Sequence, residues 1–221
     1  MHEVRVAPSI LAADFARLGA QVEQVMDVGA RVIHVDVMDG HFVPPISIGA
    51  LVVESLRELV HGREGVLDVH LMVERPERRV EDFARAGADS IAVHWEATPH
   101  VHYALNAVRE AGLGAGLAIN PATPPDVVPG LVDELDHVLC MTVNPGWGGQ
   151  RYIESSTAKV ARLRGLLGPS VPIEVDGGIE ANTAGAASAA GATLFVAGSS
   201  IFGTADPAAA YREIAAAAGA V

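Results

Sequence analysis

Short apolar segments recur along the chain, and many follow a helical pattern that ends in glycine. Gly29, Gly87, Gly112 and Gly191 occupy this position, as in DVGARVIHVD and AAGATLFVAGSS. Glycine is favoured just beyond a helix C-terminus because it adopts a left-handed backbone at little cost. The apolar segments predict eight strands, at residues 4–11, 32–37, 67–72, 90–94, 114–119, 137–143, 173–176 and 194–197. The stretches between them predict helices at 18–28, 50–59, 76–86, 101–111, 125–131, 153–166, 182–190 and 207–218.

This alternation predicts an α/β fold, and eight strand–helix units in 221 residues fit one (β/α)8 TIM barrel. We expect a single catalytic domain over residues 1–221. A doubly wound open sheet is the structural alternative. Because no G-x-G-x-x-G follows the first predicted strand, a dinucleotide-binding version of that sheet has no support of its own.

The segment HVDVMDG, which begins at His34, places an imidazole and a carboxylate two residues apart. Side chains at such spacing share one face of a strand, so His34 and Asp36 point one way. Ile33, Val35 and Val37 point the other way, which in a barrel is outward under the helices. His34 and Asp36 then point inward, near the C-terminal mouth where such barrels place their active sites.

Polar residues also stand at or near other predicted strand ends, namely Ser9, Asp68, His70, His94, Asn144 and Asp176. Among all of these, His34, Asp36, His70 and Asp176 have the side chains of a divalent metal site. Two imidazoles and two carboxylates suit zinc, iron(II), manganese or cobalt better than calcium or magnesium. Taken singly, each histidine is more often a hydrogen-bonded core residue than a metal ligand. Their convergence on strand ends favours the metal.

Asp36 and Asp176 also suggest acid–base chemistry. Since they come from the second and seventh predicted strands, they can approach a substrate carbon from opposite sides. One acid could remove a proton and the other return one to the opposite face, which inverts a stereocentre beside a carbonyl. A metal at the carbonyl would stabilise the resulting enediolate. The alternative is that Asp176 only caps the glycine turn after it.

Glycine-rich loops follow the last three predicted strands. They read NPGWGGQ, DGG and GSS, and their backbone N–H groups at Gly146, Gly148, Gly149, Gly177, Gly178, Gly198 and Ser199 could bind a phosphate. Backbone donors would hold an anion despite the net charge of −12. The alternative is that these glycines only make tight turns. NPGWGGQ, with Trp147 at its tip, could also act as a lid.

Three methionines, Met38, Met72 and Met141, lie at or near predicted strand ends. They could form an apolar collar that keeps water from a reaction intermediate. Filling of the core is the other interpretation, because methionine adapts to irregular gaps.

The overall composition excludes several classes of function. The net charge of −12 argues against binding to nucleic acid or to an anionic membrane. No apolar run reaches the roughly 18 residues of a membrane helix, and no signal peptide is evident, so we expect a cytoplasmic protein. Cys140 lies in an apolar stretch and is expected to be a buried small hydrophobe. Lys159 is the only lysine, and its polar helical surroundings make it a poor Schiff-base residue.

The motifs together resemble the ribulose-phosphate 3-epimerase family along essentially the whole chain. The matching stretches are APSILAADF at 7–15, HVDVMDGHFVP at 34–44, DVHLMV at 68–73, NPGWGGQ at 144–150, EVDGGI at 174–179 and VAGSSIF at 196–202. This resemblance implies interconversion of D-ribulose 5-phosphate and D-xylulose 5-phosphate at C3, in the pentose phosphate pathway and the Calvin cycle. It also implies a homo-oligomer, either a dimer or a larger assembly.

The resemblance further implies a role for each candidate residue. It implies one divalent metal ion per subunit on His34, Asp36, His70 and Asp176, with Asp36 and Asp176 as the acid–base pair. It implies substrate contacts from Ser9 and His70, and a phosphate site in the loops that contain Gly146–Gly149 with Trp147, Gly177–Gly178 and Gly198–Ser199. The chain departs from the usual family pattern at Pro45, Trp147 and Ser200.

Three alternative functions stay open. A 3-epimerase of a longer ketose phosphate, such as allulose 6-phosphate, would use the same chemistry in a roomier pocket. A metal-dependent lyase or aldolase could use the same barrel, although the single lysine excludes most Schiff-base versions. A non-catalytic regulator that binds sugar phosphates would keep the glycine loops but would not need two opposed acids.

Overall fold

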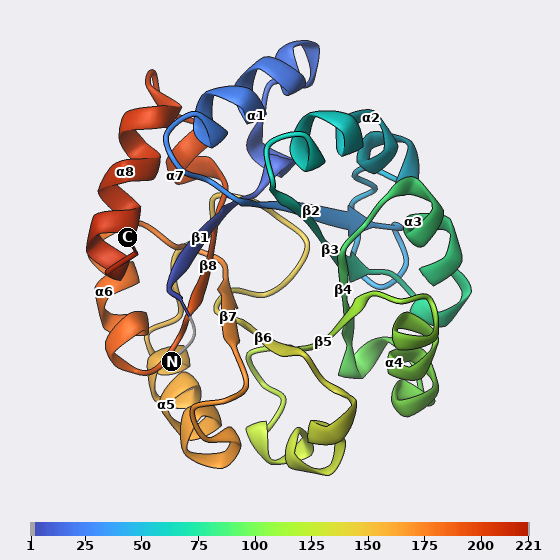
Figure 1. Cartoon of the computed structure of the whole chain (residues 1–221). Coiled ribbons are helices and arrows are strands. Elements are labelled where there is room, and N and C mark those ends of the chain that lie inside the picture. The colour runs from blue at the N-terminus through green and yellow to red at the C-terminus, as the bar shows by residue number, and fades with distance from the viewer. Residues whose placement is uncertain (1–2, 221) are drawn as a thin grey trace.

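Within residues 3–220, which the computed structural model describes, eight parallel strands surround the centre of the molecule (Figure 1). They are β1 (Arg5–Pro8), β2 (Val32–Met38), β3 (Val66–Met72), β4 (Ser90–His94), β5 (Gly114–Ile119), β6 (His137–Met141), β7 (Ile173–Asp176) and β8 (Leu194–Ala197). The predicted single domain also includes residues 1, 2 and 221, which lie outside the described residues.

The strands form a nearly closed barrel in chain order. Neighbouring strands pair from β2 through to β8, and β1 pairs with β8. An isolated parallel bridge between Ser9 and His34 joins the remaining edges, just beyond the end of β1. The predicted TIM barrel is therefore confirmed.

Helices surround the strands on the outside of the barrel (Figure 1). They are α1 (Leu18–Met26), α2 (Ala50–His61), α3 (Val80–Ala86), α4 (Val101–Glu110), α5 (Ser155–Leu167), α6 (Ala181–Ala189), α7 (Ser199–Phe202) and α8 (Pro207–Ala218). Within the described chain, no helix combines the length and apolar character needed to cross a membrane.

Several expectations about secondary structure are wrong, including the helix expected at 76–86, which is a 3-10 helix at Pro76–Arg78 followed by α3. The helix expected at 125–131 is replaced by two 3-10 helices, Pro125–Val127 and Pro129–Glu134. Pro129 explains the break, because proline lacks the N–H group that would continue the hydrogen bonds of the first 3-10 helix. The first strand ends at Pro8 instead of residue 11. The next residue, Ser9, caps a short 3-10 helix by accepting a hydrogen bond from the Leu11 N–H. The short helix α7 was not expected at all.

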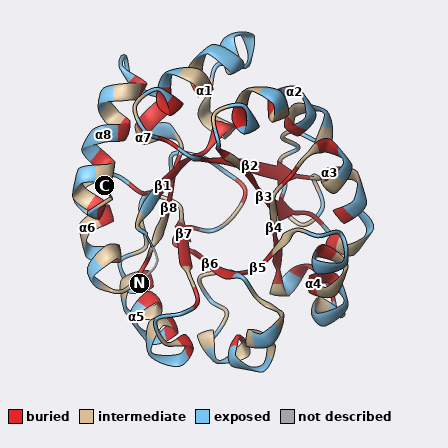
Figure 2. Cartoon of the chain, viewed as in Figure 1, coloured by how far each residue is buried: buried red, intermediate tan, exposed pale blue. Residues whose placement is uncertain are grey.

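The apolar faces of the strands pack under the helices, as the alternation predicted. Ile33, Val35 and Val37 belong to the large apolar core, and Cys140 is buried in the same core. Burying each such aliphatic side chain stabilises the fold by about 1.5–3 kcal/mol. Burial also raises the pKa of the Cys140 thiol to about 11, so it stays an unreactive thiol. Figure 2 shows the buried strands inside a ring of helices with exposed outer faces.

Candidate active site

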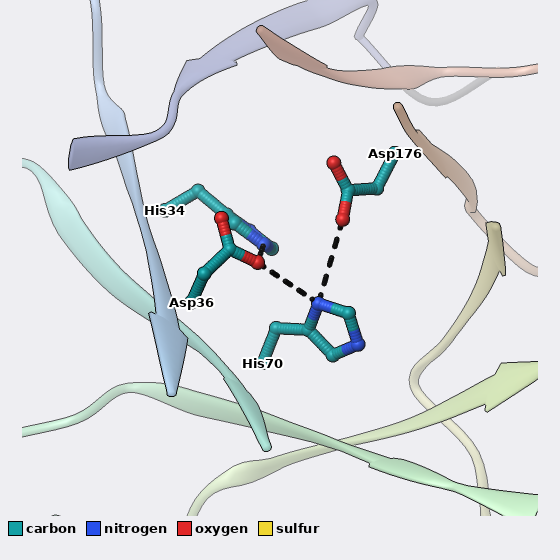
Figure 3. Close-up of side chains that lie close together, drawn as sticks. All are labelled: His34, Asp36, His70 and Asp176. Atoms are coloured by element: carbon teal, nitrogen blue, oxygen red, sulfur yellow. Dashed lines mark hydrogen bonds and ion pairs between the residues drawn. The ribbon is translucent and has the colours of Figure 1, made fainter. Parts of the chain in front are cut away.

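Four side chains converge inside the barrel from three strands (Figure 3). His34 and Asp36 lie two residues apart on β2, and the strand register places His70 of β3 beside Asp36. Asp176 is the last residue of β7 and reaches the same point. The strand alternation therefore turns the polar face inward, as the sequence predicted.

The cluster of His34, Asp36, His70 and Asp176 has the geometry of a cation site. Asp36 Oδ1 lies 3.4 Å from His34 Nε2 and 3.1 Å from His70 Nδ1, and Asp176 Oδ2 lies 3.5 Å from His70 Nδ1. One donor atom from each residue lies within 4.8 Å of the others. His34 Nε2 is buried and has no hydrogen-bond partner among the described residues. This donor set could hold a divalent metal ion.

The other nitrogen of His34 is held by buried acids. His34 Nδ1 lies 2.7 Å from Asp68 Oδ2 and 3.3 Å from Glu174 Oε1. A carboxylate behind an imidazole fixes the ring and aims its second nitrogen at the metal position. Asp68 was among the polar residues predicted near strand ends, whereas Glu174 was not. The signal was present, because Glu174 stands two residues before Asp176 and so shares its face of β7.

The buried charges shift the pKa values of the cluster. Burial alone would raise the pKa of Asp36, but the nearby imidazoles of His34 and His70 outweigh burial and lower that pKa. Burial and the negative charge of Asp36 raise the pKa of Asp176. Burial and the charge of Asp68 raise the pKa of Glu174 to about 8. Two acids whose pKa values move apart in one site are typical of sites that transfer protons.

Ser9 and Asn144, two other residues from strand ends, differ in position. The Ser9 hydroxyl donates a hydrogen bond to Asp36 Oδ2 at 2.5 Å, so Ser9 belongs to the cluster. Asn144 is exposed, and its backbone carbonyl accepts a hydrogen bond from Gln150. β6 ends at Met141, three residues earlier, so Asn144 lies in the loop beyond the strand and not on its inner face.

A cavity of about 320 Å³ opens next to Asp36 and Asp176. Its walls include Met38, Met72 and Met141, each almost completely buried. The loops after β6, β7 and β8 contribute the expected residues Gly146, Trp147, Gly148, Gly149, Gly177, Gly178, Gly198 and Ser199. The fold therefore brings the acids, the methionines and the glycine loops to one cavity.

Comparisons with known proteins agree with this geometry. The family model described as "Ribulose-phosphate 3 epimerase family" matches residues 5–202. The chain belongs to this family. A ribulose-phosphate 3-epimerase of Bacillus subtilis (strain 168) is 47% identical over 215 residues, covering 96% of this chain and 98% of the relative. The chloroplastic ribulose-5-phosphate-3-epimerase of Arabidopsis thaliana is 47% identical over 217 residues, covering 96% of this chain and 76% of the relative.

Solved structures support the fold. KGPDC from Streptococcus mutans in complex with D-R5P superposes with a TM-score of 0.76 at 17% identity, covering 98% of this chain and 97% of the other. At this identity the match shows a shared fold only.

Two of the three departures from the ribulose-phosphate 3-epimerase pattern lie at loop contacts. The Ser200 hydroxyl donates to the Ile179 carbonyl at 2.7 Å and so joins the loops after β7 and β8. Pro45 lies beside the loop after β6, where a Cβ on Gly146 would be 3.6 Å from its Cδ. The third departure, Trp147, is 56% exposed and lines the cavity.

The loop after β7 requires glycine at residue 178. Gly178 has a φ of +67°, and a Cβ there would lie 2.3 Å from the backbone nitrogen of Tyr152. We expect Gly178→Ala to lower the free energy of unfolding by about 1–3 kcal/mol, because rigid backbone must move. Urea unfolding measures this, with Gly130→Ala as the control, since a Cβ on Gly130 meets nothing within 4 Å. Equal stability of the two variants would contradict the expected clash.

Proposed function

We propose that this chain interconverts D-ribulose 5-phosphate and D-xylulose 5-phosphate by proton transfer at C3. The observation that carries the proposal is the entry of Asp36 and Asp176 into one cavity from β2 and β7, which are not neighbouring strands. Family membership and the activity named for the relatives point to the same reaction. The chloroplastic relative is consistent with a role in the Calvin cycle, and the pentose phosphate pathway uses the same interconversion.

The two aspartates would act as a proton donor and acceptor on opposite faces of C3. One carboxylate takes the C3 proton, and the electrons of the C–H bond form the double bond of an enediolate. The other carboxyl group then donates its proton to the opposite face of C3, which inverts the stereocentre. Ser9 would keep Asp36 in position through its 2.5 Å hydrogen bond. Met38, Met72 and Met141 would form a collar that excludes water from the enediolate.

We propose that His34, Asp36, His70 and Asp176 together hold one divalent metal ion, either zinc, iron(II), manganese or cobalt. The unpartnered His34 Nε2 and the two-imidazole, two-carboxylate donor set support this assignment. When bound, the metal would supply Lewis-acid stabilisation of the negative charge that develops next to C3. Asp68 and Glu174 would orient His34 for this role.

The glycine loops would bind the phosphate through backbone N–H groups. The donors would come from Gly146, Gly148 and Gly149, from Gly177 and Gly178, and from Gly198 and Ser199 at the start of α7. His70 is completely buried behind the cavity wall, so its contact with the sugar stays a prediction. Trp147 would close over the sugar as a lid. Assembly into a homo-oligomer and a cytoplasmic location stay predictions.

A substrate comparison tests the proposed function. We expect purified protein to convert ribulose 5-phosphate to xylulose 5-phosphate with a kcat/KM of about 10⁴ M⁻¹s⁻¹ or more. Allulose 6-phosphate should react at least about 10-fold more slowly, because its chain is one carbon longer than that of the proposed substrate. A preference for allulose 6-phosphate would contradict the proposed substrate, and cleavage to smaller aldehydes would indicate a lyase.

A further inference from the structure

We propose that His94 and Glu96 are positioning residues that fix the proton of His70 on Nε2 and leave Nδ1 free to bind the metal. The inference rests on the metal site proposed above. Among the described residues, no carboxylate lies behind the Nε2 atom of His70, in contrast to the Nδ1 atom of His34. A second imidazole takes that place.

The three residues form one line of hydrogen bonds from the site to the barrel rim. His70 Nε2 lies 2.8 Å from His94 Nε2, and both rings are completely buried. The rings stack with centroids 4.9 Å apart and an interplanar angle of 29°. His94 Nδ1 lies 3.1 Å from Glu96 Oε2. The line therefore connects the ends of β3 and β4 to the loop that follows β4.

The carboxylate of Glu96 determines which nitrogen donates in each of these hydrogen bonds. An ionised carboxylate only accepts, so His94 Nδ1 must carry a proton. A neutral His94 then has its lone pair on Nε2 and accepts from His70. His70 must in turn donate from Nε2, so Nδ1 is the nitrogen that can present a lone pair to the cluster. Glu96 therefore sets the tautomer of His94, and His94 sets the tautomer of His70.

Glu96 is itself held in one orientation. Its Oε1 accepts hydrogen bonds from the Asn120 N–H at 2.8 Å and from the Thr123 hydroxyl. Lys159 donates to the Asn120 carbonyl at 2.5 Å and fixes that segment from the other side. Because both partners of Oε1 are donors, only an oxygen atom fits there.

An imidazole between Glu96 and His70 has an electrostatic advantage. The cluster already contains Asp36 and Asp176, and Asp68 and Glu174 lie behind His34. A further carboxylate directly behind His70 would add another charge to a buried, strongly acidic site. His94 lets Glu96 orient His70, and it keeps the negative charge of Glu96 one imidazole ring further from the cluster.

The substitution Glu96→Gln tests which atoms donate and which accept in these hydrogen bonds, because glutamine has nearly the same shape as glutamate. The amide oxygen must stay opposite the Asn120 and Thr123 donors, so the NH₂ group faces His94. His94 Nδ1 then has to accept, and its Nε2–H opposes the Nε2–H of His70. We expect the affinity of chelator-stripped protein for Zn²⁺ to fall roughly 10- to 100-fold. The matched control Glu58→Gln changes an exposed side chain on α2 and should change the affinity by no more than about threefold.

Nitrogen-15 NMR of the imidazoles in metal-free protein gives a readout that is independent of metal binding. The wild type should show His94 as the Nδ1–H tautomer, and Glu96→Gln should show it as the Nε2–H tautomer. An Nε2–H tautomer of His94 in the wild type would overturn the proposal, as would wild-type Zn²⁺ affinity in folded Glu96→Gln. If the wild type binds no Zn²⁺, the proposed metal site fails, while the His94 tautomer still decides the positioning role.

A second pair of variants covers the case in which Glu96→Gln does not fold. His94→Gln retains an acceptor for His70 Nε2–H, whereas His94→Leu removes it. We expect Zn²⁺ to bind His94→Gln at least about 10-fold more tightly than His94→Leu. Equal affinities would overturn the proposal.

Discussion

Replacing Asp36 with asparagine is expected to lower kcat for epimerisation of ribulose 5-phosphate by a factor on the order of 10² to 10⁴. The amide cannot accept the C3 proton, and it is a poorer metal ligand than a carboxylate. The glycine loops do not depend on Asp36, so competition by inorganic phosphate should persist. The measurement is a coupled assay of xylulose 5-phosphate formation with phosphate as the competitor.

Asp126→Asn provides the control for the Asp36 variant. Asp126 is exposed and pairs with Arg162 outside the barrel, so its loss should leave kcat within about threefold of the wild type. Thermal unfolding of both variants shows whether they are folded. Undiminished turnover in folded Asp36→Asn would contradict the two-aspartate mechanism.

The second large effect is expected from His34→Gln. The change removes the buried Nε2, and we expect Zn²⁺ affinity to fall by about 100-fold or more, with a parallel loss of turnover. Asp68 and Glu174 also lose their shared imidazole partner, which should lower the melting temperature. Calorimetric titration with Zn²⁺ and a thermal melt measure the two effects.

His102→Gln is the matched histidine control. His102 lies on α4 with 63% of its side chain exposed, so neither Zn²⁺ binding nor the melting temperature should change. Full Zn²⁺ affinity in His34→Gln would show that the metal binds elsewhere.

Much of the site could be predicted because, in a parallel barrel, the spacing of residues within each strand decides which side chains meet at the barrel mouth. The two-residue period of β2 and β7 was enough to direct His34, Asp36 and Asp176 inward. Parallel strands then bring their C-terminal ends to one mouth, whatever their separation along the chain. The outward faces were predictable for the same reason, as Ile33 and Val35 show.

The features that escaped prediction depend on contacts between distant segments. Glu96 meets Asn120 and Thr123 only because the loops after β4 and β5 lie side by side, 24 and 27 residues apart in sequence. Helix α7 covers only four residues, too few for a periodic pattern. The helix predicted at 125–131 does not form, because Pro129 interrupts a stretch whose apolar spacing is otherwise helical.

In the proposed mechanism, two aspartates in a metal-dependent site move the C3 proton of ribulose 5-phosphate. The most direct test is to incubate the purified protein with ribulose 5-phosphate in deuterated water and follow C3 by NMR, before and after chelation. We predict that solvent deuterium enters C3 as xylulose 5-phosphate forms, and that chelation stops both. Absence of both exchange and xylulose 5-phosphate in a folded, metal-loaded sample would contradict the account.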